Sequence, residues 1–410
     1  MSSFAARKSE LEFVGCRDCG QIQSIAAAAY GGSLRCVRCG YTLERLNGRS
    51  LTLAFACSLA TLLLLFPANL LPILQVNILA ATNHSYIASG VVGIWAQGWP
   101  VAAIVIGLEI IALPFLRFGL LSLVLGMLWL GRPAAWLGRG FRWAEWLDNW
   151  AMMDVFVFGG FIGYERVVQE LPVRILPGGY CVIAAAFLSL VTRAALERRQ
   201  IWRRIGPVAR EAAPDMICCT SCDHPAPPVA EGRPCPRCGA TMWRCRPYAP
   251  MRAMALTLAG FAFYPVAYLY PMESSDVLGD LTGYSILTGV FKLVQAHLWI
   301  FAVIIFSASV LIPLLKLFAF AWFGLSIQRR SRARLRLKTR LYRLIDTIGR
   351  WSHIDVFTVS VFLPLMHLSG LLAVLVGKAL PAFLAVVVLT MLAASLFDPR
   401  AMWLAAERRA

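Results

Sequence analysis

Eight cysteines, arranged as four C-x2-C pairs, are the residues of this sequence whose spacing points most directly to chemistry. Sixteen residues separate the first two pairs, and twelve separate the other two, which lie in the middle of the chain. Four thiolates in paired knuckles at such separations are typical of a tetrahedral zinc ribbon. We therefore predict two structural zinc ions, one held by Cys16, Cys19, Cys36 and Cys39 and the other by Cys219, Cys222, Cys235 and Cys238.

Charged and hydroxyl side chains inside strongly apolar segments form a second group of candidates. An ionised side chain within a membrane is costly unless it is paired or faces water, so it is by default a functional candidate. Lys316 precedes a run of seven apolar residues, and Asp355 lies one turn into an apolar segment. We predict that transport or coupling involves Lys316, Asp355, Ser309, Thr390, Ser360, Asp154, Arg117 and Glu109.

Two ion pairs are expected among these residues, Asp154 with Arg117 and Asp355 with Lys316, because adjacent helices would bring them to similar depths. Two interpretations stay open, a structural pair that braces the helices and a titratable relay. The additional hydroxyl groups of the second half of the chain favour that half as the working one. His353, beside Asp355, is a candidate proton shuttle or a helix cap.

The candidates recur because the chain repeats itself. Arg117 corresponds to Lys316 at an offset of 199 residues, and Asp154 corresponds to Asp355 at an offset of 201. Cys36 and Cys39 likewise recur as Cys235 and Cys238, at the same offset of 199 residues. A nearly constant offset over such a length indicates duplication of a whole module.

The composition excludes an ordinary soluble protein. Of the 410 residues, 59% are hydrophobic and 15% are charged, and the mean hydropathy is +0.66. A helix that crosses a hydrocarbon core about 30 Å thick needs about 20 apolar residues. Eight segments meet this requirement: 51–71, 97–117, 150–169, 176–196, 252–271, 298–325, 352–374 and 379–397.

These segments predict an all-α polytopic membrane protein with eight transmembrane helices in two duplicated four-helix modules. A small four-cysteine zinc ribbon precedes each module. The predicted division is zinc ribbon 1 at 1–48, membrane module 1 at 49–200, zinc ribbon 2 at 201–247 and membrane module 2 at 248–410.

The distribution of the net charge of +17 predicts the orientation in the membrane. Basic residues cluster at 198–210 and 329–350, whereas the loops at 72–96 and 272–285 contain no lysine or arginine. Because positive loops remain in the cytoplasm, both termini and both zinc ribbons should be cytoplasmic. An even number of spans then relates the modules by an approximate two-fold axis along the membrane normal. Juxtamembrane arginines are ordinary topology signals, so we expect no nucleic-acid partner.

Alternatives remain at the cysteines. Cys218 adjoins Cys219, although only Cys219 leaves two residues before Cys222, so the identity of that ligand stays open. Disulfides or a redox C-x-x-C pair would use the same spacing, but a cytoplasmic compartment disfavours stable disulfides. A site closed by four thiolates has no open coordination position, so we expect no catalysis there.

In combination, these motifs resemble those of the LetA/PqiA family (paraquat-inducible protein A-like) of bacterial inner-membrane proteins. The residues that carry the resemblance extend over nearly the whole chain. Three features depart from the family pattern: in the first copy, Trp150-Ala151-Met152-Met153-Asp154 and Arg117 in place of a lysine, and in the second copy, a Tyr-Pro-Val-Ala-Tyr segment in place of Pro-Ala-Asn. The matching elements are the paired C-x2-C knuckles, Phe66-Pro67-Ala68-Asn69-Leu70-Leu71-Pro72, the Ile-x-Ser/Thr-Gly-Val element, Pro313-Leu314-Leu315-Lys316, Trp351-Ser352-His353-Ile354-Asp355-Val356-Phe357, and Leu389-Thr390-Met391 leading to Phe397-Asp398-Pro399-Arg400.

The resemblance implies a partner and a substrate. Members of this family work with MCE-domain proteins that form periplasmic tunnels between the inner and outer membranes, and they load membrane phospholipid into the tunnel or receive it. The sequence has no G-x-x-x-x-G-K-[ST] phosphate-binding loop, so the energy would come from a partner or an ion gradient. We hypothesise that protonation of Asp355 releases Lys316 and changes helix packing.

Two other classes of function remain open. The chain could be a passive membrane anchor for the periplasmic tunnel, in which case substitutions at Lys316 or Asp355 should be tolerated. It could also be a thiol oxidoreductase that uses the C-x-x-C pairs, in which case the cysteines should titrate and bind no zinc. We favour the transporter and do not expect an enzyme.

Overall fold

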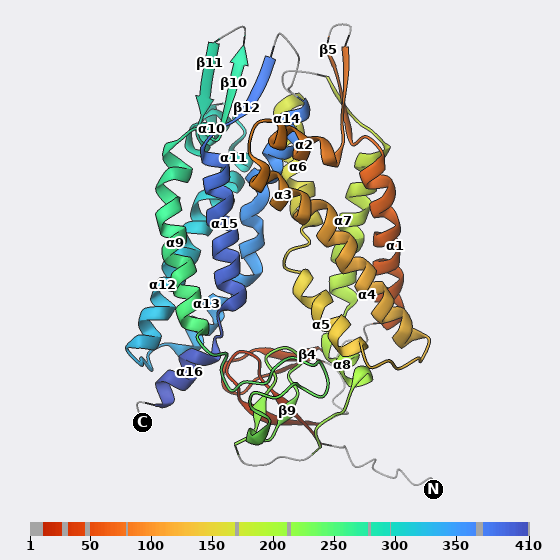
Figure 1. Ribbon diagram of the computed structural model, residues 1–410, viewed down its shortest axis with the longest axis vertical. Coiled ribbons are helices and arrows are strands. Elements are labelled where there is room, and N and C mark those ends of the chain that lie inside the picture. Colours follow the sequence, from red (N-terminus) through yellow and green to blue (C-terminus); the bar gives the residue numbers. More distant parts are fainter. Residues whose placement is uncertain are drawn as a thin grey trace.

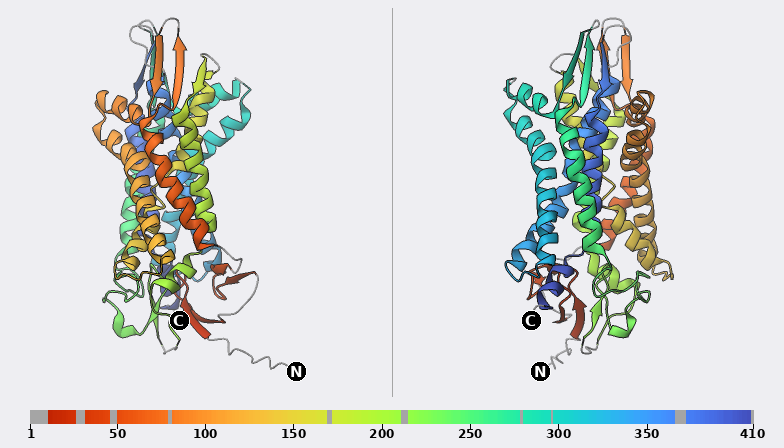
Figure 2. Two further views of the ribbon diagram at one scale, coloured as in Figure 1. Left: turned by 90° about the vertical axis from the view of Figure 1, so that its right-hand side faces the viewer. Right: turned by 60° about the vertical axis from the view of Figure 1, so that its left-hand side comes forward.

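The computed structural model describes residues 11–26, 32–45, 50–78, 81–168, 172–210, 215–277, 280–295, 297–365 and 372–408. Figure 1 shows two helical modules side by side, with the cysteine-bearing ribbons together at one end and two small sheets at the other. The same arrangement is visible from two further directions in Figure 2. The two modules therefore point the same way.

Within the described residues, six helices are long and apolar enough to cross a membrane. Two of them are continuous 30-residue helices, each containing a short π-helical turn, η1 (Leu108–Ala112) or η3 (Ser307–Leu311). The remaining four are unbroken. In module one the spans are α1 (Leu51–Leu70), α3 (Pro100–Gly107) with η1 and α4 (Leu113–Trp129), and α7 (Pro177–Ala195), and in module two they are α9 (Ala249–Leu269), α11 (Trp299–Phe306) with η3 and α12 (Ile312–Gln328), and α15 (Ala379–Leu396).

The π turns have a local cause in the sequence. Pro114 and Pro313 are the second residues of α4 and α12, and proline has no backbone N–H to donate to the preceding turn. The residue before each proline bonds five positions back, Leu113 to the carbonyl of Leu108 and Ile312 to that of Ser307. The wider turn accommodates the proline without ending the helix, and such turns occur often at functional sites.

The third apolar segment of each module differs from the prediction of a full-length span. Helix α6 (Met153–Val168) has 16 residues and α14 (Ile354–Leu365) has 12, both short of the length a bilayer requires. Part of each predicted segment also lies outside the described residues. The count of eight transmembrane helices is therefore not confirmed, and the described residues give six.

Helices α6 and α14 instead pack against each other and join the two modules. The hydroxyl of Thr358 donates to the carbonyl of Gly159 at 3.1 Å. The rings of Phe156 and Phe357 meet edge to face with centroids 5.9 Å apart. A side chain at Gly159 would come within 2.9 Å of the carbonyl of Ile354, so this contact depends on the absence of a Cβ.

Each module also contains a three-stranded antiparallel sheet, which the prediction of an all-α membrane region missed. The central strand follows the first span, and the third strand directly precedes the last span. The strand orders are β6-β5-β7 and β11-β10-β12. Their bounds are β5 (Leu74–Ile78), β6 (Ala81–Ser85), β7 (Val173–Ile175), β10 (Glu273–Val277), β11 (Asp280–Tyr284) and β12 (Leu372–Val376).

Short helices complete the repeat at both ends of the spans. Helices α2 and α10 lie toward the sheets, and α5 and α13 lie at the opposite end. A further helix, α8 or α16, follows the last span of each module. Their bounds are α2 (Ile87–Ala96), α5 (Leu137–Leu147), α8 (Arg198–Ile205), α10 (Ile286–Gln295), α13 (Leu335–Ile348) and α16 (Arg400–Glu407), and a 3-10 turn η4 (Gly349–His353) precedes α14.

The ribbons consist of short hairpins with a cysteine knuckle at each turn. Gly20 and Gly40 follow their knuckles with φ of +75° and +72°, a conformation that glycine adopts most readily. Gly239 has the same role in the second ribbon, whereas Asp223 takes the fourth such position. The strands are β1 (Leu11–Gly15), β2 (Ile22–Ala26), β3 (Ser33–Arg35) and β4 (Thr42–Arg45) in ribbon one, and β8 (Ile217–Cys218) and β9 (Pro225–Ala226) in ribbon two, which also has the 3-10 turn η2 (Pro228–Ala230).

Candidate metal centres and intramembrane charges

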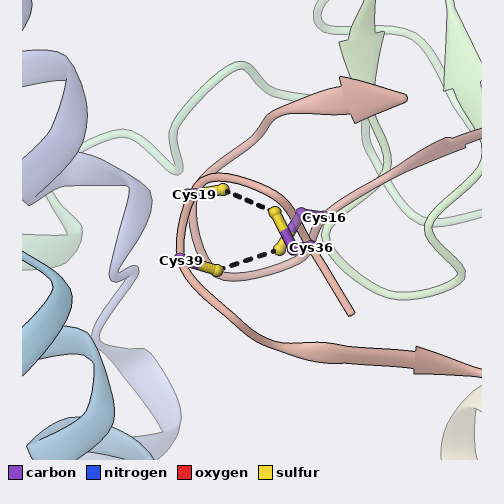
Figure 3. A group of neighbouring side chains, drawn as sticks. All are labelled: Cys16, Cys19, Cys36 and Cys39. Atoms are coloured by element: carbon purple, nitrogen blue, oxygen red, sulfur yellow. Dashed lines mark hydrogen bonds between the residues drawn. The ribbon is translucent and has the colours of Figure 1, made fainter. Parts of the chain in front are cut away.

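The cysteines predicted as ligands converge in two buried clusters. In ribbon one, the Sγ atoms of Cys16 and Cys39 lie 3.5 Å apart and those of Cys19 and Cys36 lie 3.6 Å apart (Figure 3). In ribbon two, the corresponding contacts are both 3.5 Å, and all four Sγ atoms of each cluster lie within 4.8 Å of one another. Tetrahedral thiolate ligands about 2.3 Å from a zinc ion stand about 3.8 Å apart. Both clusters therefore have the spacing that a tetrahedral ion requires.

The structure resolves the choice between Cys218 and Cys219. Cys219 belongs to the second cluster, whereas the thiol of Cys218 points to the carbonyl of Cys16 at 3.6 Å. Burial raises the pKa of Cys218 to about 11, which keeps it a neutral thiol. Neither His224 nor Cys245 belongs to the cluster.

Arginines of the helices at this end attach the ribbons to the membrane modules. Arg400, at the start of α16, is almost fully buried and donates to the carbonyl of Arg17 at 3.0 Å and to that of Cys218 at 2.7 Å. One side chain thus bonds a knuckle of each ribbon. Arg343 of α13 donates to the carbonyl of Cys39 at 3.1 Å and to its Sγ at 3.2 Å.

Helix α8 attaches ribbon one through a second set of charges. Arg203 lies 2.7 Å from a carboxylate oxygen of Glu12 and 2.6 Å from one of Glu44, and Arg199 lies 3.1 and 3.2 Å from the same two groups. Burial raises the pKa of Glu12, but the hydrogen bond from Arg203 and the charge of Arg199 outweigh it and hold that pKa below its usual range. Glu12 is therefore ionised near neutral pH.

Module one contains a connected network of buried charges at the ribbon end of its spans. Arg193 of α7 lies 2.8 Å from a carboxylate oxygen of Asp148 and 2.7 Å from one of Asp154. Arg117 forms an ion pair with Asp148, and Arg350 of module two reaches Asp154 at 3.4 Å. The predicted pair of Asp154 with Arg117 is therefore wrong, because Asp148 lies between them in the network.

At the equivalent place in module two, no ion pair of Lys316 occurs among the described residues. Lys316 is 1% exposed, and its Nζ donates to the carbonyl of Gly349 at 2.6 Å and to the hydroxyl of Ser352 at 3.1 Å. Gly349 occupies the position of Asp148, and Ala394 that of Arg193, at the 201-residue offset of this region. The lysine therefore has neutral hydrogen-bond acceptors where its counterpart has a carboxylate.

The predicted pair of Asp355 with Lys316 is also wrong. Asp355 lines a small cavity of about 30 Å³ with Thr358, Met272 and Tyr284, toward the sheet end of the module. Lys316 bonds to η4, on the ribbon side of Asp355. Protonation of Asp355 consequently has no ion pair with Lys316 to release, and that hypothesis is withdrawn.

Glu109 and His353 make a buried contact between the modules. Nε2 of His353 lies 3.1 Å from Oε1 of Glu109, and both side chains are almost fully buried. The geometry is that of a close contact between ionisable groups rather than an aligned hydrogen bond. The matching π turns place Ala308 at the position in module two that is equivalent to Glu109, so the second copy has no carboxylate there.

The three candidate hydroxyl groups of module two are buried within their helices. Ser360 donates to the carbonyl of Phe357 at 2.8 Å, and Thr390 donates to that of Val387 at 2.9 Å. The carbonyl of Ser309, in the π turn, accepts a hydrogen bond from the hydroxyl of Tyr268. No hydrogen bond from the Ser309 hydroxyl to the other described residues is found. None of the three hydroxyls contacts Lys316 in this conformation.

A family model described as Paraquat-inducible protein A matches the chain twice, at residues 51–206 and 251–407. This chain belongs to the paraquat-inducible protein A family. The resemblance inferred from the motifs is thereby confirmed, and so is the internal duplication. Each match ends with the short helix that follows the last span, α8 or α16, and neither includes a four-cysteine cluster.

Relatives of known name cover nearly the whole chain. It is 26% identical over 406 residues to intermembrane transport protein PqiA of Escherichia coli (strain K12), covering 95% of this chain and 94% of the relative. It is 27% identical over 401 residues to lipophilic envelope-spanning tunnel protein A of the same strain, covering 97% and 92%. A probable intermembrane transport protein of Haemophilus influenzae is 23% identical over 410 residues, covering 96% and 95%. No solved structure matches the chain.

Sequence reasoning missed the partners that complete these sites. Asp148 and Arg193 have no charged counterpart in the second copy, where Gly349 and Ala394 stand at the equivalent positions, so the repeat did not point to them. Gly349 and Ser352 offer Lys316 a backbone carbonyl and a hydroxyl, which carry no charge signal in the sequence. The family's membrane repeat is thus conspicuous in sequence, whereas its internal contacts are not.

Proposed function

We propose that this chain is the inner-membrane component of an MCE-type lipid transport system, exchanging phospholipid between the membrane and a periplasmic tunnel built by an MCE-domain partner. The names of its relatives, which include intermembrane transport proteins, support transport between membranes. The observation that carries the proposal is Lys316, a buried cation held by neutral groups inside an apolar helix. It lies twelve residues before the end of α12, about 18 Å along the helix axis.

The proposed orientation places both ribbons and both termini in the cytoplasm and both sheets in the periplasm. The basic clusters at 198–210 and 329–350 lie at the ribbon end of the spans, and positive loops remain in the cytoplasm. The two sheets then face the periplasmic partner. We also propose that the chain divides into ribbon 1 (1–48), module 1 (49–200), ribbon 2 (201–247) and module 2 (248–410), because each group of cysteines precedes one group of apolar segments.

Two zinc ions are the proposed cofactors, and their role is structural. The four thiolates of each cluster form a closed, buried donor set of the kind that zinc ribbons use. Zinc bound there would hold the knuckles in the conformation to which Arg400 and Arg343 donate. The cysteines thus supply support for the modules and no catalytic chemistry.

Coupling to a proton gradient is a further part of the proposal, with the contact between His353 and Glu109 as its site. Histidine and glutamate side chains can each carry a proton, and this contact joins η4 of module two to η1 of module one. Charged groups on the elements packed against η4 include Lys316 on α12, Asp355 on α14 and Asp154 on α6. Helix α13 adds Asp346 and four basic residues, Arg336, Lys338, Arg340 and Arg343, and η4 itself carries Arg350. Gain or loss of a proton by the pair would change the attraction between the modules.

Reconstituted lipid transfer tests the proposal against a passive anchor. Purified chain in liposomes is mixed with an MCE-domain tunnel protein, and transfer of a fluorescent phospholipid to that protein is followed. We expect Lys316→Met to reduce transfer at least tenfold without weakening binding of the partner. Lys338→Met is the matched control, because Lys338 is also a buried lysine bonded to a hydroxyl, that of Ser326 at 2.6 Å. Equal transfer by both variants and the unsubstituted chain would support the anchor.

Metal analysis tests the cofactor and the oxidoreductase alternative together. A purified chain with two closed ribbons should contain about two zinc ions, because each site takes one ion. The cluster cysteines should resist alkylation until a chelator is added. Absence of zinc together with readily alkylated or disulfide-bonded cysteines in the ribbons would favour redox chemistry instead.

A further inference from the structure

A large cavity lies between the two modules at the ribbon end of the molecule. Its volume is about 960 Å³, at the upper end of the range for ligand-binding pockets. Helix α5 of module one, the ends of α9 and α15 of module two and the second ribbon supply its walls. Figure 1 shows the ribbons beneath the space that separates α5 from α15.

The cavity has an excess of positive charge. Seven arginines and three carboxylates are among its lining residues. Two of the carboxylates already have cationic partners, because Asp148 pairs with Arg193 and Glu145 pairs with Arg198. The third, Asp346, lies at the inner end of the cavity.

Three of these arginines have guanidinium groups with no hydrogen bond or ion pair in the described chain, Arg17, Arg142 and Arg252. Arg17 belongs to the first ribbon and has carboxylates near it, whereas Arg142 of α5 and Arg252 of α9 come from opposite modules. Their guanidinium groups are thus left to attract an anion in the cavity. A phosphate is the group that an arginine fork binds best, through two parallel charge-assisted hydrogen bonds.

Tryptophans on α5 indicate the depth at which the cavity opens. Trp143 and Trp146 line it while remaining 51% and 45% exposed. Tryptophan side chains gather at the level of the lipid headgroups, with the ring partly in the bilayer and the N–H toward water. A second cavity of about 210 Å³ adjoins the first, shares Asp148, Arg193 and Asp346 with it, and reaches Lys316.

We propose that this cavity binds the phosphodiester headgroup of a phospholipid from the leaflet on the ribbon side, with Arg142 and Arg252 contacting the phosphate from the two modules. This inference rests on the proposed function and extends it, because it assigns the place where a lipid first meets the protein. The adjoining cavity leads from that place to Lys316. Bound headgroup charge also bridges the modules, since each contributes one of the two arginines.

Photolabelling of the full-length chain in nanodiscs tests the assignment. The probe is phosphatidylglycerol with a diazirine on an acyl carbon next to the glycerol, and labelled peptides are identified by mass spectrometry. We expect label on α5 and α9, reduced about tenfold in R142Q/R252Q, since loss of charge-assisted hydrogen bonds has an effect of that size. The matched control is R132Q/R329Q, which removes two exposed arginines at the ends of α4 and α12, outside the cavity.

The outcomes separate the possible sources of phosphate. Undiminished label in R142Q/R252Q overturns the assignment, as does equal loss in both double variants, which would indicate general attraction of lipid to a basic surface. Loss of label on addition of millimolar inorganic phosphate shows a site for a soluble anion and also overturns it. Melting temperatures of both variants in the same nanodiscs verify that they are folded.

The experiment is independent of the proposed function because it needs no partner protein and no transfer. Normal labelling of α5 and α9 in a chain that transfers no lipid refutes the proposed function and leaves the binding site in place. Normal transfer by R142Q/R252Q with unchanged labelling refutes the binding site alone.

Discussion

The two modules share one architecture but solve the same electrostatic problem differently. In module one, Arg117 meets the carboxylate of Asp148, and the network continues through Arg193 to Asp154. In module two, Lys316 meets a backbone carbonyl and a hydroxyl. A charge that is neutralised by several partners is locked in one geometry, whereas a cation with neutral acceptors keeps the capacity to bind an anion. The difference indicates that module one braces the assembly and module two responds.

The prediction with the largest expected effect concerns the bracing module. Asp154→Asn removes the buried carboxylate that Arg193 and Arg350 share, so Arg350 loses its ion pair and Arg193 keeps only Asp148. Breaking a buried ion pair in this way costs about 3–5 kcal/mol. We expect a large fall in the melting temperature of the purified protein, measured by circular dichroism in detergent. An unchanged melting temperature would show that this network does not hold module one together.

A second prediction places a carboxylate within direct reach of Lys316, where the described structure has only Gly349. In Gly349→Asp the new Cβ would lie 2.8 Å from Cε of Lys316, so the flexible end of the lysine must shift slightly and then pairs with the carboxylate. We expect lipid transfer to fall about tenfold with little change in melting temperature. Gly349→Asn is the matched control, with the same size and no charge. Full transfer by the aspartate variant would contradict a role for the unneutralised lysine.

A third pair of substitutions exchanges the two cations. Lys316→Arg should reduce transfer several-fold, because the planar guanidinium cannot reproduce the compact contacts of the ammonium group with Gly349 and Ser352. Arg117→Lys should leave transfer within about twofold and lower stability by about 1–2 kcal/mol, because one ion pair of the network is weakened. Equal transfer defects in the two variants would mean that the modules work symmetrically. The measurements are the transfer rate and the melting temperature of each variant.

The smallest effect is expected from the hydroxyl of Ser360. The only described hydrogen bond of this hydroxyl goes to the carbonyl of Phe357 in the same helix. That carbonyl belongs to the backbone hydrogen-bond pattern of the helix and does not need the serine hydroxyl as a donor. Ser360→Ala should therefore change stability by less than about 1 kcal/mol and leave transfer unaltered. The measurement is lipid transfer by this variant. A marked defect would indicate that α14, and not the surroundings of Lys316, is the part of module two that transport requires.

Much of the architecture was predictable because it depends on local composition. The four-cysteine knuckles, the long apolar helices and the 199-residue repeat follow from residue type and spacing. None of them requires knowledge of the tertiary contacts. The sheets were missed because strands such as β5 and β12 are short and stand beside strongly apolar spans. The predicted span at 352–374 is described only in part, as helix α14 up to Leu365 and as strand β12 from Leu372.

The contacts of the candidate site were less predictable because they depend on rotation about helix axes. Depth along a span places Lys316 and Asp355 near each other, yet they lie on different sides of the turn η4 and have different neighbours. The contact of His353 with Glu109 joins residues 244 positions apart on two modules, and no periodicity in the sequence relates them. Asp148 and Arg193 complete the network only after α4, α6 and α7 are assembled.

The bonds of Arg400 impose an order on biosynthesis. This residue follows every membrane helix in the chain, yet its guanidinium group bonds the first knuckle, at Arg17, as well as the third, at Cys218. While the spans are still being synthesised, the four cysteines of ribbon one are already present, but Arg400, which bonds this ribbon at Arg17, is not. The two halves acquire their common base only when translation has passed α15, so a chain interrupted earlier would lack that junction and be open to proteolysis.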